Sequence, residues 1–103
     1  MRSANLDFKA LNRLALQKMP AVLGRFLPGG ITRGQEYIAR NPTRADRALG
    51  SFKVNLHTGR WADFATGDGG GDIISLVAYV GNTGQLEAAR LVQEMIGGNH
   101  DTP

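Results

Sequence analysis

The sequence contains no cysteine. The chain therefore forms no disulfide, presents no thiolate nucleophile and supplies no sulfur ligand to zinc or to an iron–sulfur cluster. Long apolar runs are missing as well, because the longest, residues 73–80, is far below the ~20 residues that span a bilayer. The first residues lack the apolar stretch of a signal peptide. We therefore expect a cytoplasmic protein with no membrane partner.

Histidine is scarce, since it occurs only at His57 and His100. We expect the first in a hairpin turn and the second in a C-terminal tail, and neither has a nearby nucleophile or orienting acid in the sequence. General-base catalysis requires such a positioned partner. The length of 103 residues suits one domain and excludes large catalytic scaffolds. We predict a protein that is not an enzyme and that needs no cofactor.

Positive charge is concentrated in the first sixty residues. Residues 1–32 hold five bases and one acid, residues 33–60 hold six bases and two acids, and residues 61–103 hold one base and six acids. This division is typical of a surface that faces a polyanion. We predict that one group of residues binds nucleic acid, namely Arg33, Arg40, Arg44, Arg47, Lys53, Asn55 and Arg60. The alternative is a solvated strand face and loop.

The pattern of apolar residues predicts helices, then a small sheet, then helices, which is an α+β fold. Residues 1–30 form a helical hairpin, with Asn5 as the first N-cap and Pro28 ending the second helix. Strands are expected at residues 36–40, 52–56 and 60–65, and these form an antiparallel sheet of about three strands. Alternation along residues 52–56 buries Phe52 and Val54 and places Lys53 on the other face.

Residues 66–72 are rich in glycine and are predicted to be a loop without regular structure. A helix follows that starts at Asp72 or Gly71 and runs through Val80, and an acid at its start suits the positive end of the helix. A last helix is capped by Thr83 and ends at Gly97. The prediction is a single domain over residues 1–98, in which a helical leader (1–30) precedes the core (34–98). Residues 99–103 form a tail.

Five short segments of residues 41–89 occur in a recognisable order. They are Asn41-Pro42-Thr43-Arg44, Gly50-Ser51-Phe52-Lys53-Val54, Trp61-Ala62-Asp63-Phe64, Gly67-Asp68-Gly69-Gly70-Gly71-Asp72-Ile73-Ile74 and Glu87-Ala88-Ala89. This order resembles the N-terminal zinc-ribbon module of bacterial and phage DNA primases, above all in the primase-like and helicase-like proteins of phages, plasmids and integrated elements. Residues 60–72 are the most specific part of the resemblance, which implies a zinc-ribbon-derived fold over roughly the last two-thirds of the chain.

The resemblance also locates the positions that hold zinc in metal-binding members, which here are Asn41, Arg44, Phe64 and Gly67. None of these side chains is a serviceable nitrogen or sulfur donor for tetrahedral zinc. We therefore predict a degenerate site without metal. Apolar packing must then supply the folding free energy that zinc contributes, and we expect Phe64 to do so together with Trp61 and Phe52.

Two further sets of residues have both a ligand-binding and a structural interpretation. Tyr37 and Trp61 could stack on an unpaired base if exposed, although large aromatic residues in small domains are usually buried. The glycine turn, formed by Gly67, Gly69, Gly70 and Gly71, could cradle a phosphate. It lacks the Lys-Ser/Thr of a P-loop, so we favour a tight turn that packs a helix against a strand. Asp63, Asp68 and Asp72 are a weaker candidate for Mg²⁺.

Together these observations predict a non-catalytic module that engages single-stranded template DNA during replication of a phage, plasmid or integrated element. Its expected protein partner is a primase catalytic domain or a helicase. The alternative is an adaptor that docks such a partner through its C-terminal helix without contacting DNA. The two are distinguished by whether the basic side chains converge on one surface.

Overall fold

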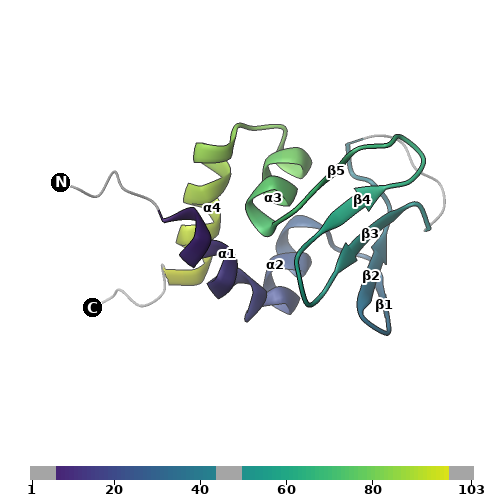
Figure 1. Ribbon diagram of the computed structural model, residues 1–103, viewed down its shortest axis with the longest axis horizontal. Coiled ribbons are helices and arrows are strands. Elements are labelled where there is room, and N and C mark those ends of the chain that lie inside the picture. Colours follow the sequence, from purple (N-terminus) through teal and green to yellow (C-terminus); the bar gives the residue numbers. More distant parts are fainter. Residues whose placement is uncertain (1–6, 44–49, 98–103) are drawn as a thin grey trace.

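The computed structural model describes residues 7–43 and 50–97. Within these ranges it has an α+β fold, as the sequence predicts. The elements are α1 (Phe8–Leu16), α2 (Met19–Phe26), β1 (Ile31–Arg33), β2 (Glu36–Ala39), β3 (Phe52–Asn55), β4 (Trp61–Asp63), β5 (Gly69–Gly70), α3 (Ile73–Gly81) and α4 (Gln85–Gly97). The helices lie at one end of the molecule and the sheet at the other (Figure 1). No described helix has the length and apolar character that crossing a membrane requires.

The described strands form one antiparallel sheet in the order β1-β2-β3-β4-β5. Strands β2, β3 and β4 confirm the predicted sheet. Strand β1 lies outside the predicted strands, because its three residues are too few to show an alternating pattern. A two-residue turn joins β1 to β2, with Gly34 at φ 58° and Gln35 at negative φ. This is the pattern of a type II′ hairpin turn, in which glycine takes the first central position.

The glycine-rich segment is not entirely irregular, so the prediction of a loop over residues 66–72 is wrong in part. Gly69 and Gly70 pair with Ala62 and Trp61 and form β5. Gly67 has a φ of 87°, which favours glycine. Gly70 is needed for another reason, because a Cβ there would lie 2.6 Å from the Trp61 indole nitrogen. The segment therefore packs β5 against α3, as the structural interpretation of the glycines expects.

The helix N-termini can be compared with the predicted capping residues. Asp7 caps α1 through a hydrogen bond from the Ala10 N–H, whereas the predicted cap Asn5 lies outside the described residues. Asp72, which is predicted at the start of this helix, is the N-cap of α3 and forms a capping box with Ser75. The prediction of Thr83 as the cap of α4 is wrong, because the helix begins two residues later, at Gln85, and the Thr83 hydroxyl donates to the Gly84 carbonyl.

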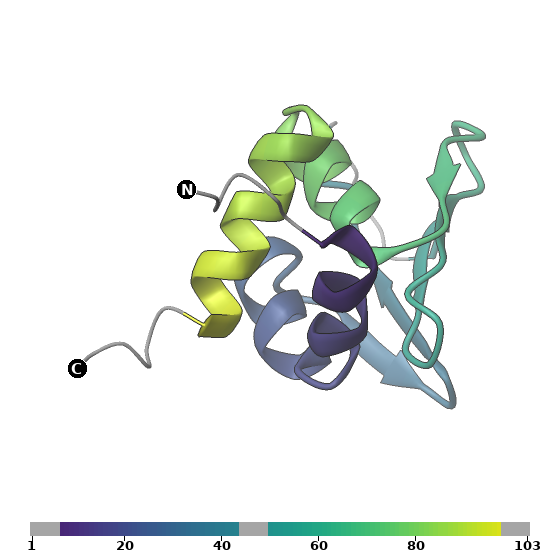
Figure 2. The same ribbon diagram turned by 60° about the vertical axis from the view of Figure 1, so that its left-hand side comes forward.

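The core lies between the helices and one face of the sheet. Phe52, Trp61 and Tyr79 form an aromatic cluster, with ring centroids 4.7–6.0 Å apart. The Trp61 indole N–H donates to Ser75 Oγ on α3 at 2.9 Å, which satisfies its polar atom. The described helices all lie on this one side of the sheet (Figure 2). The opposite face of the sheet has no described helix over it.

Candidate nucleic-acid interface

The sheet face that points away from the helices gathers cationic and apolar side chains. Cross-strand partners in an antiparallel sheet point to the same face, and the register therefore defines rows across the strands. One row is Arg33, Glu36 and Asn55. Arg60 adjoins this row, because the Asn55 N–H donates to its carbonyl. A second row is Ile31, Ile38, Lys53, Ala62 and Gly69. We call this face the outer face.

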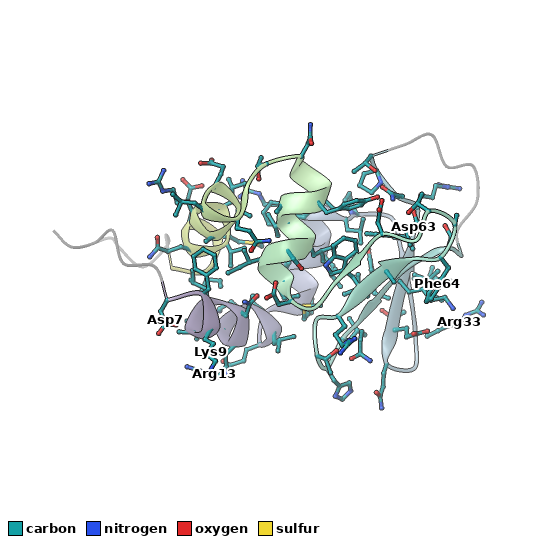
Figure 3. The ribbon with its side chains drawn as sticks, turned by 45° about the horizontal axis from the view of Figure 1, so that its top comes forward. Asp7, Lys9, Arg13, Arg33, Asp63 and Phe64 are labelled. Atoms are coloured by element: carbon teal, nitrogen blue, oxygen red, sulfur yellow. The ribbon has the colours of Figure 1, made fainter. Side chains whose placement is uncertain are left out.

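Phe64 follows Ala62 by two residues in the sequence and extends the outer face beyond it. Its N–H donates to the Ser51 carbonyl at 2.8 Å, so the pairing with the β3 segment continues past the end of β4. The Phe64 side chain is 71% exposed. Arg33 and Phe64 lie at the sheet end of the molecule, far from the cations Lys9 and Arg13 on α1 (Figure 3). An aromatic ring this exposed is free to contact a ligand.

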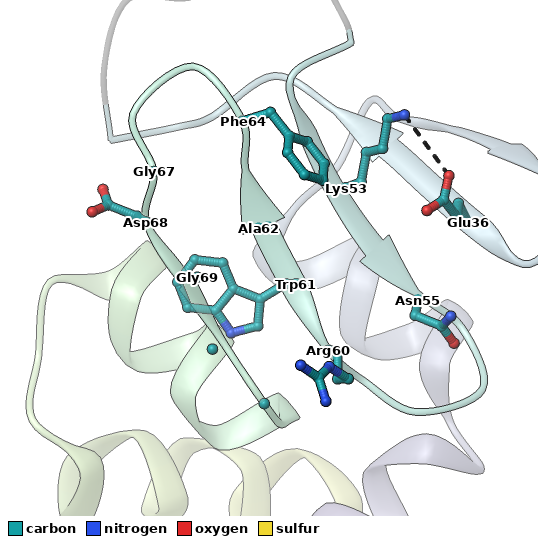
Figure 4. A pocket seen from close by; sticks show the side chains of 12 residues that line it. Glu36, Lys53, Asn55, Arg60, Trp61, Ala62, Phe64, Gly67, Asp68 and Gly69 are labelled. Atoms are coloured by element: carbon teal, nitrogen blue, oxygen red, sulfur yellow. Dashed lines mark ion pairs between the residues drawn. The ribbon is translucent and has the colours of Figure 1, made fainter.

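An open groove of about 580 Å³ runs along the outer face between the Lys53–Phe64 pair and β5 (Figure 4). It brings together many of the predicted site residues from separate parts of the chain. The lining residues are Glu36, Lys53, Asn55, Arg60, Trp61, Ala62, Phe64, Gly67, Asp68, Gly69, Gly70 and Gly71. Ala62 and the glycines contribute only small side chains or none, so planar groups have access to the backbone between the larger lining residues.

Lys53 is held between an acid and the aromatic ring. Its ammonium lies 3.9 Å from Glu36 Oε1 and 5.7 Å from the centroid of the Phe64 ring. The side chains of Lys53 and Glu36 are 35% and 48% exposed, and a pair in such contact with solvent contributes at most about 1 kcal/mol. The amine is therefore readily redirected toward a phosphate that approaches Phe64.

The β3–β4 turn positions two polar residues that line the groove, Asn55 and Arg60. Asn55 Oδ1 accepts hydrogen bonds from the N–H groups of His57 and Thr58 at 2.8 and 2.9 Å. The carboxamide oxygen of Asn55 therefore builds the turn, and its NH₂ group remains as the donor suited to an acceptor in the groove. His57 is exposed in this turn, as predicted. Arg60 follows the turn and is exposed beside the groove.

The remaining predicted site residues either lie away from the groove, are buried, or fall outside the described residues. Arg40 is exposed directly after β2, and Arg44 and Arg47 lie outside the described residues. Tyr37 belongs to the opposite face, where its hydroxyl donates to the Leu27 carbonyl and accepts from the Gly30 N–H. Trp61 is 6% exposed. The condition for base stacking, an exposed ring face, is therefore not met by Trp61, whereas Tyr37 is half-buried.

The predicted packing role of Phe64 is wrong. Phe52 and Trp61 are buried as expected, but Phe64 lies on the outer face. The signal that identifies it is present in the sequence, because Trp61 and Phe64 are three residues apart and alternation sends them to opposite faces of a strand. The exposed aromatic residue that sequence reasoning missed is therefore Phe64.

A polar network occupies the region where the resemblance locates the metal ligands. Asn41 is 1% exposed and donates from Nδ2 to Asp63 Oδ2 at 2.7 Å and to the Tyr79 hydroxyl at 2.8 Å. The Tyr79 hydroxyl donates to Asp68 Oδ2, and Thr43 Oγ1 donates to Asn41 Oδ1. Hydrogen bonds thus join the segment after β2 to the turn after β4, in addition to the apolar packing of Phe52 and Trp61.

The three carboxylates considered for Mg²⁺ have separate tasks. Asp63 is 0% exposed and accepts from Asn41 and from the Ala65 N–H. Asp72 caps α3, and Asp68 accepts from Tyr79. Among residues 7–43 and 50–97, no group of three or more His, Cys, Asp or Glu residues has the arrangement to hold a metal ion.

The outer face therefore combines an exposed aromatic ring, adjacent cations and a floor of small residues. Comparison of the chain with protein-family models, curated proteins and solved structures finds no significant match.

Proposed function

We propose that the protein is a non-catalytic module that binds single-stranded DNA on the outer face of its sheet. The observation that carries the proposal is the 71% exposed ring of Phe64 beside Lys53, at the rim of a groove that also contains Arg60. A base stacked on an aromatic side chain contributes about 1–3 kcal/mol. The cations supply the contacts to the phosphate backbone that dominate nucleic-acid affinity.

A single strand suits this surface better than a duplex. Stacking on Phe64 needs an unpaired base, whose flat face is available only when it has left a duplex. The groove floor of Ala62 and Gly69 is open and lacks a protruding helix or ribbon to enter a major groove. The arrangement therefore favours recognition of a flexible strand through its bases and backbone rather than readout of a duplex sequence.

The proposed role is to present single-stranded template to a primase catalytic domain or a helicase in replication of a phage, plasmid or integrated element. The resemblance of residues 41–89 to the primase zinc-ribbon module supports this part of the proposal. The role implies a cytoplasmic protein and assigns the chemistry of nucleotide transfer to the partner.

Fluorescence anisotropy with a labelled single-stranded oligonucleotide tests the proposal at several salt concentrations. We expect Phe64→Leu, which keeps an apolar side chain but no ring, to weaken binding about 5- to 150-fold. Phe64→Trp should retain affinity. Arg60→Ala should reduce the slope of log affinity against log salt by about 0.7, the value for one phosphate contact on a single strand.

Arg90→Ala is the matched control, because Arg90 is an exposed arginine on α4, on the helical side of the molecule. It should leave both the affinity and the salt slope almost unchanged. Equal effects of Arg60→Ala and Arg90→Ala would indicate diffuse attraction and contradict a defined interface. Salt-independent behaviour, or no binding at low salt, would favour the adaptor alternative.

A further inference from the structure

Strand β1 presents an unpaired edge. It is the first strand in the order of the described sheet, and its three residues are exposed. In a hairpin with a two-residue turn, the pair flanking the turn exchanges both backbone hydrogen bonds. Here that pair is Arg33 and Glu36, so the N–H and C=O of Thr32 point away from β2. Such groups are a template for an added strand.

An apolar pocket of about 420 Å³ lies beside this edge, between α2 and the β1–β2 hairpin. It is lined by Met19, Pro20, Leu23, Gly24, Thr32, Tyr37 and Leu56. Thr32 therefore belongs both to the edge and to the pocket wall. A residue paired with Thr32 on an added strand points to the same face of the sheet, which is the face of the pocket. Gly24 contributes no side chain, and its Cβ position is open.

The charged residues of the segment that forms α1, α2 and β1 are all basic. Between Asp7 and Glu36 the sequence contains five bases and no acid. Two of the bases border the pocket from α2, because Lys18 precedes the helix and Arg25 lies in its last turn. Both are exposed, whereas Arg33 at the end of β1 belongs to the outer face. A segment that docks here is therefore favoured when it carries negative charge.

We propose that an extended acidic segment of a partner protein adds to β1 as a further strand and inserts one apolar side chain into this pocket. In this mode the backbone of the edge provides affinity, and the pocket selects alternate side chains. The docking surface is separate from the outer face, because the pocket lies on the helical side of the sheet. Binding of the segment and of a nucleic acid are therefore compatible on one molecule.

The test is an NMR titration of the uniformly ¹⁵N-labelled full chain with an amidated heptapeptide. The peptide carries glutamate at its odd positions and valine, leucine and valine at its even positions, so that its apolar side chains share one face. We expect saturable shifts of the Thr32 and Leu23 amides. A peptide with arginine in place of every glutamate should bind at least tenfold more weakly.

Two variants separate the edge from the pocket. Thr32→Pro removes the outward N–H without removing a hydrogen bond to β2, and proline is tolerated on edge strands. Gly24→Leu fills the mouth of the pocket from the exposed side of α2 and favours the helix. Each should weaken peptide binding at least tenfold, whereas Leu86→Ala, at an exposed leucine on α4, should have no effect. If Thr32→Pro does not fold, Gly24→Leu still decides the outcome.

Three results would overturn the proposal. The first is unchanged peptide affinity in Gly24→Leu. The second is self-association of the free protein, measured by sedimentation, that Gly24→Leu abolishes, since this would assign the edge to a second copy of the chain. The third is displacement of the peptide by a single-stranded oligonucleotide that itself shifts Thr32 and Leu23, because the surface would then bind nucleic acid.

Discussion

The hydrogen bond between Asn41 and Asp63 offers the sharpest test of how this fold is held together. Replacing Asn41 by alanine removes the donor that lies 2.7 Å from a fully buried carboxylate. A hydrogen bond to a charged group contributes about 1.5–3 kcal/mol, and a neutral one about 0.5–1.5 kcal/mol. Asn41 also donates to Tyr79 and accepts from Thr43.

We therefore expect Asn41→Ala to lower the free energy of unfolding by about 2–4 kcal/mol, of a total that is typically about 5–15 kcal/mol. In a domain of this size that loss corresponds to a fall in Tm on the order of 10–25 °C. Urea denaturation followed by Trp61 fluorescence and by circular dichroism measures the change. The buried indole reports the core, and circular dichroism reports the helices.

A double-mutant cycle isolates the pair. Asp63→Ala alone should also be strongly destabilising, and the double variant should cost less than the sum of the two single variants by about 1.5–3 kcal/mol. Thr43→Ala, at an exposed residue that also bonds Asn41, is the control and should cost no more than about 1 kcal/mol. A loss below about 1 kcal/mol in Asn41→Ala, with additive effects in the cycle, would refute the structural role of the network.

Three further predictions concern stability. Gly70→Ala should cost about 1–3 kcal/mol because the new methyl group collides with Trp61 and Ser75, whereas Gly71→Ala, with open space around its Cβ, should change urea midpoints little. Asp72→Ala removes the capping box of α3 and should cost about 0.5–2 kcal/mol; an unchanged midpoint would argue against the cap. Phe64→Ala should leave the thermal midpoint nearly unchanged, while Phe52→Ala should cost about 3–5 kcal/mol, and similar losses in both would contradict the exposure of Phe64.

The sequence by itself determined the features that depend on local spacing. Alternation placed Lys53 and Asn55 on the face opposite Phe52 and Val54, because strand side chains alternate whatever the rest of the chain does. Asp72 is predicted near the start of α3 because an acid suits the positive end of a helix, an interaction that acts within one turn. The α+β class followed from the same local periodicities.

Tertiary structure decided what depends on pairing between distant segments. The Asn41–Asp63 bond joins residues 22 positions apart, and nothing in either residue's neighbourhood specifies the other. Strand β5 exists because Trp61 and Ala62 provide backbone partners for two glycines that have little strand propensity of their own. Phe64 is a surface residue because the register between β3 and β4 places Trp61 and Asp63 on the buried face. Alternation alone sends Trp61 and Phe64 to opposite faces of the strand, but which of the two faces the helices cover, and hence which ring is buried, is decided by the tertiary packing.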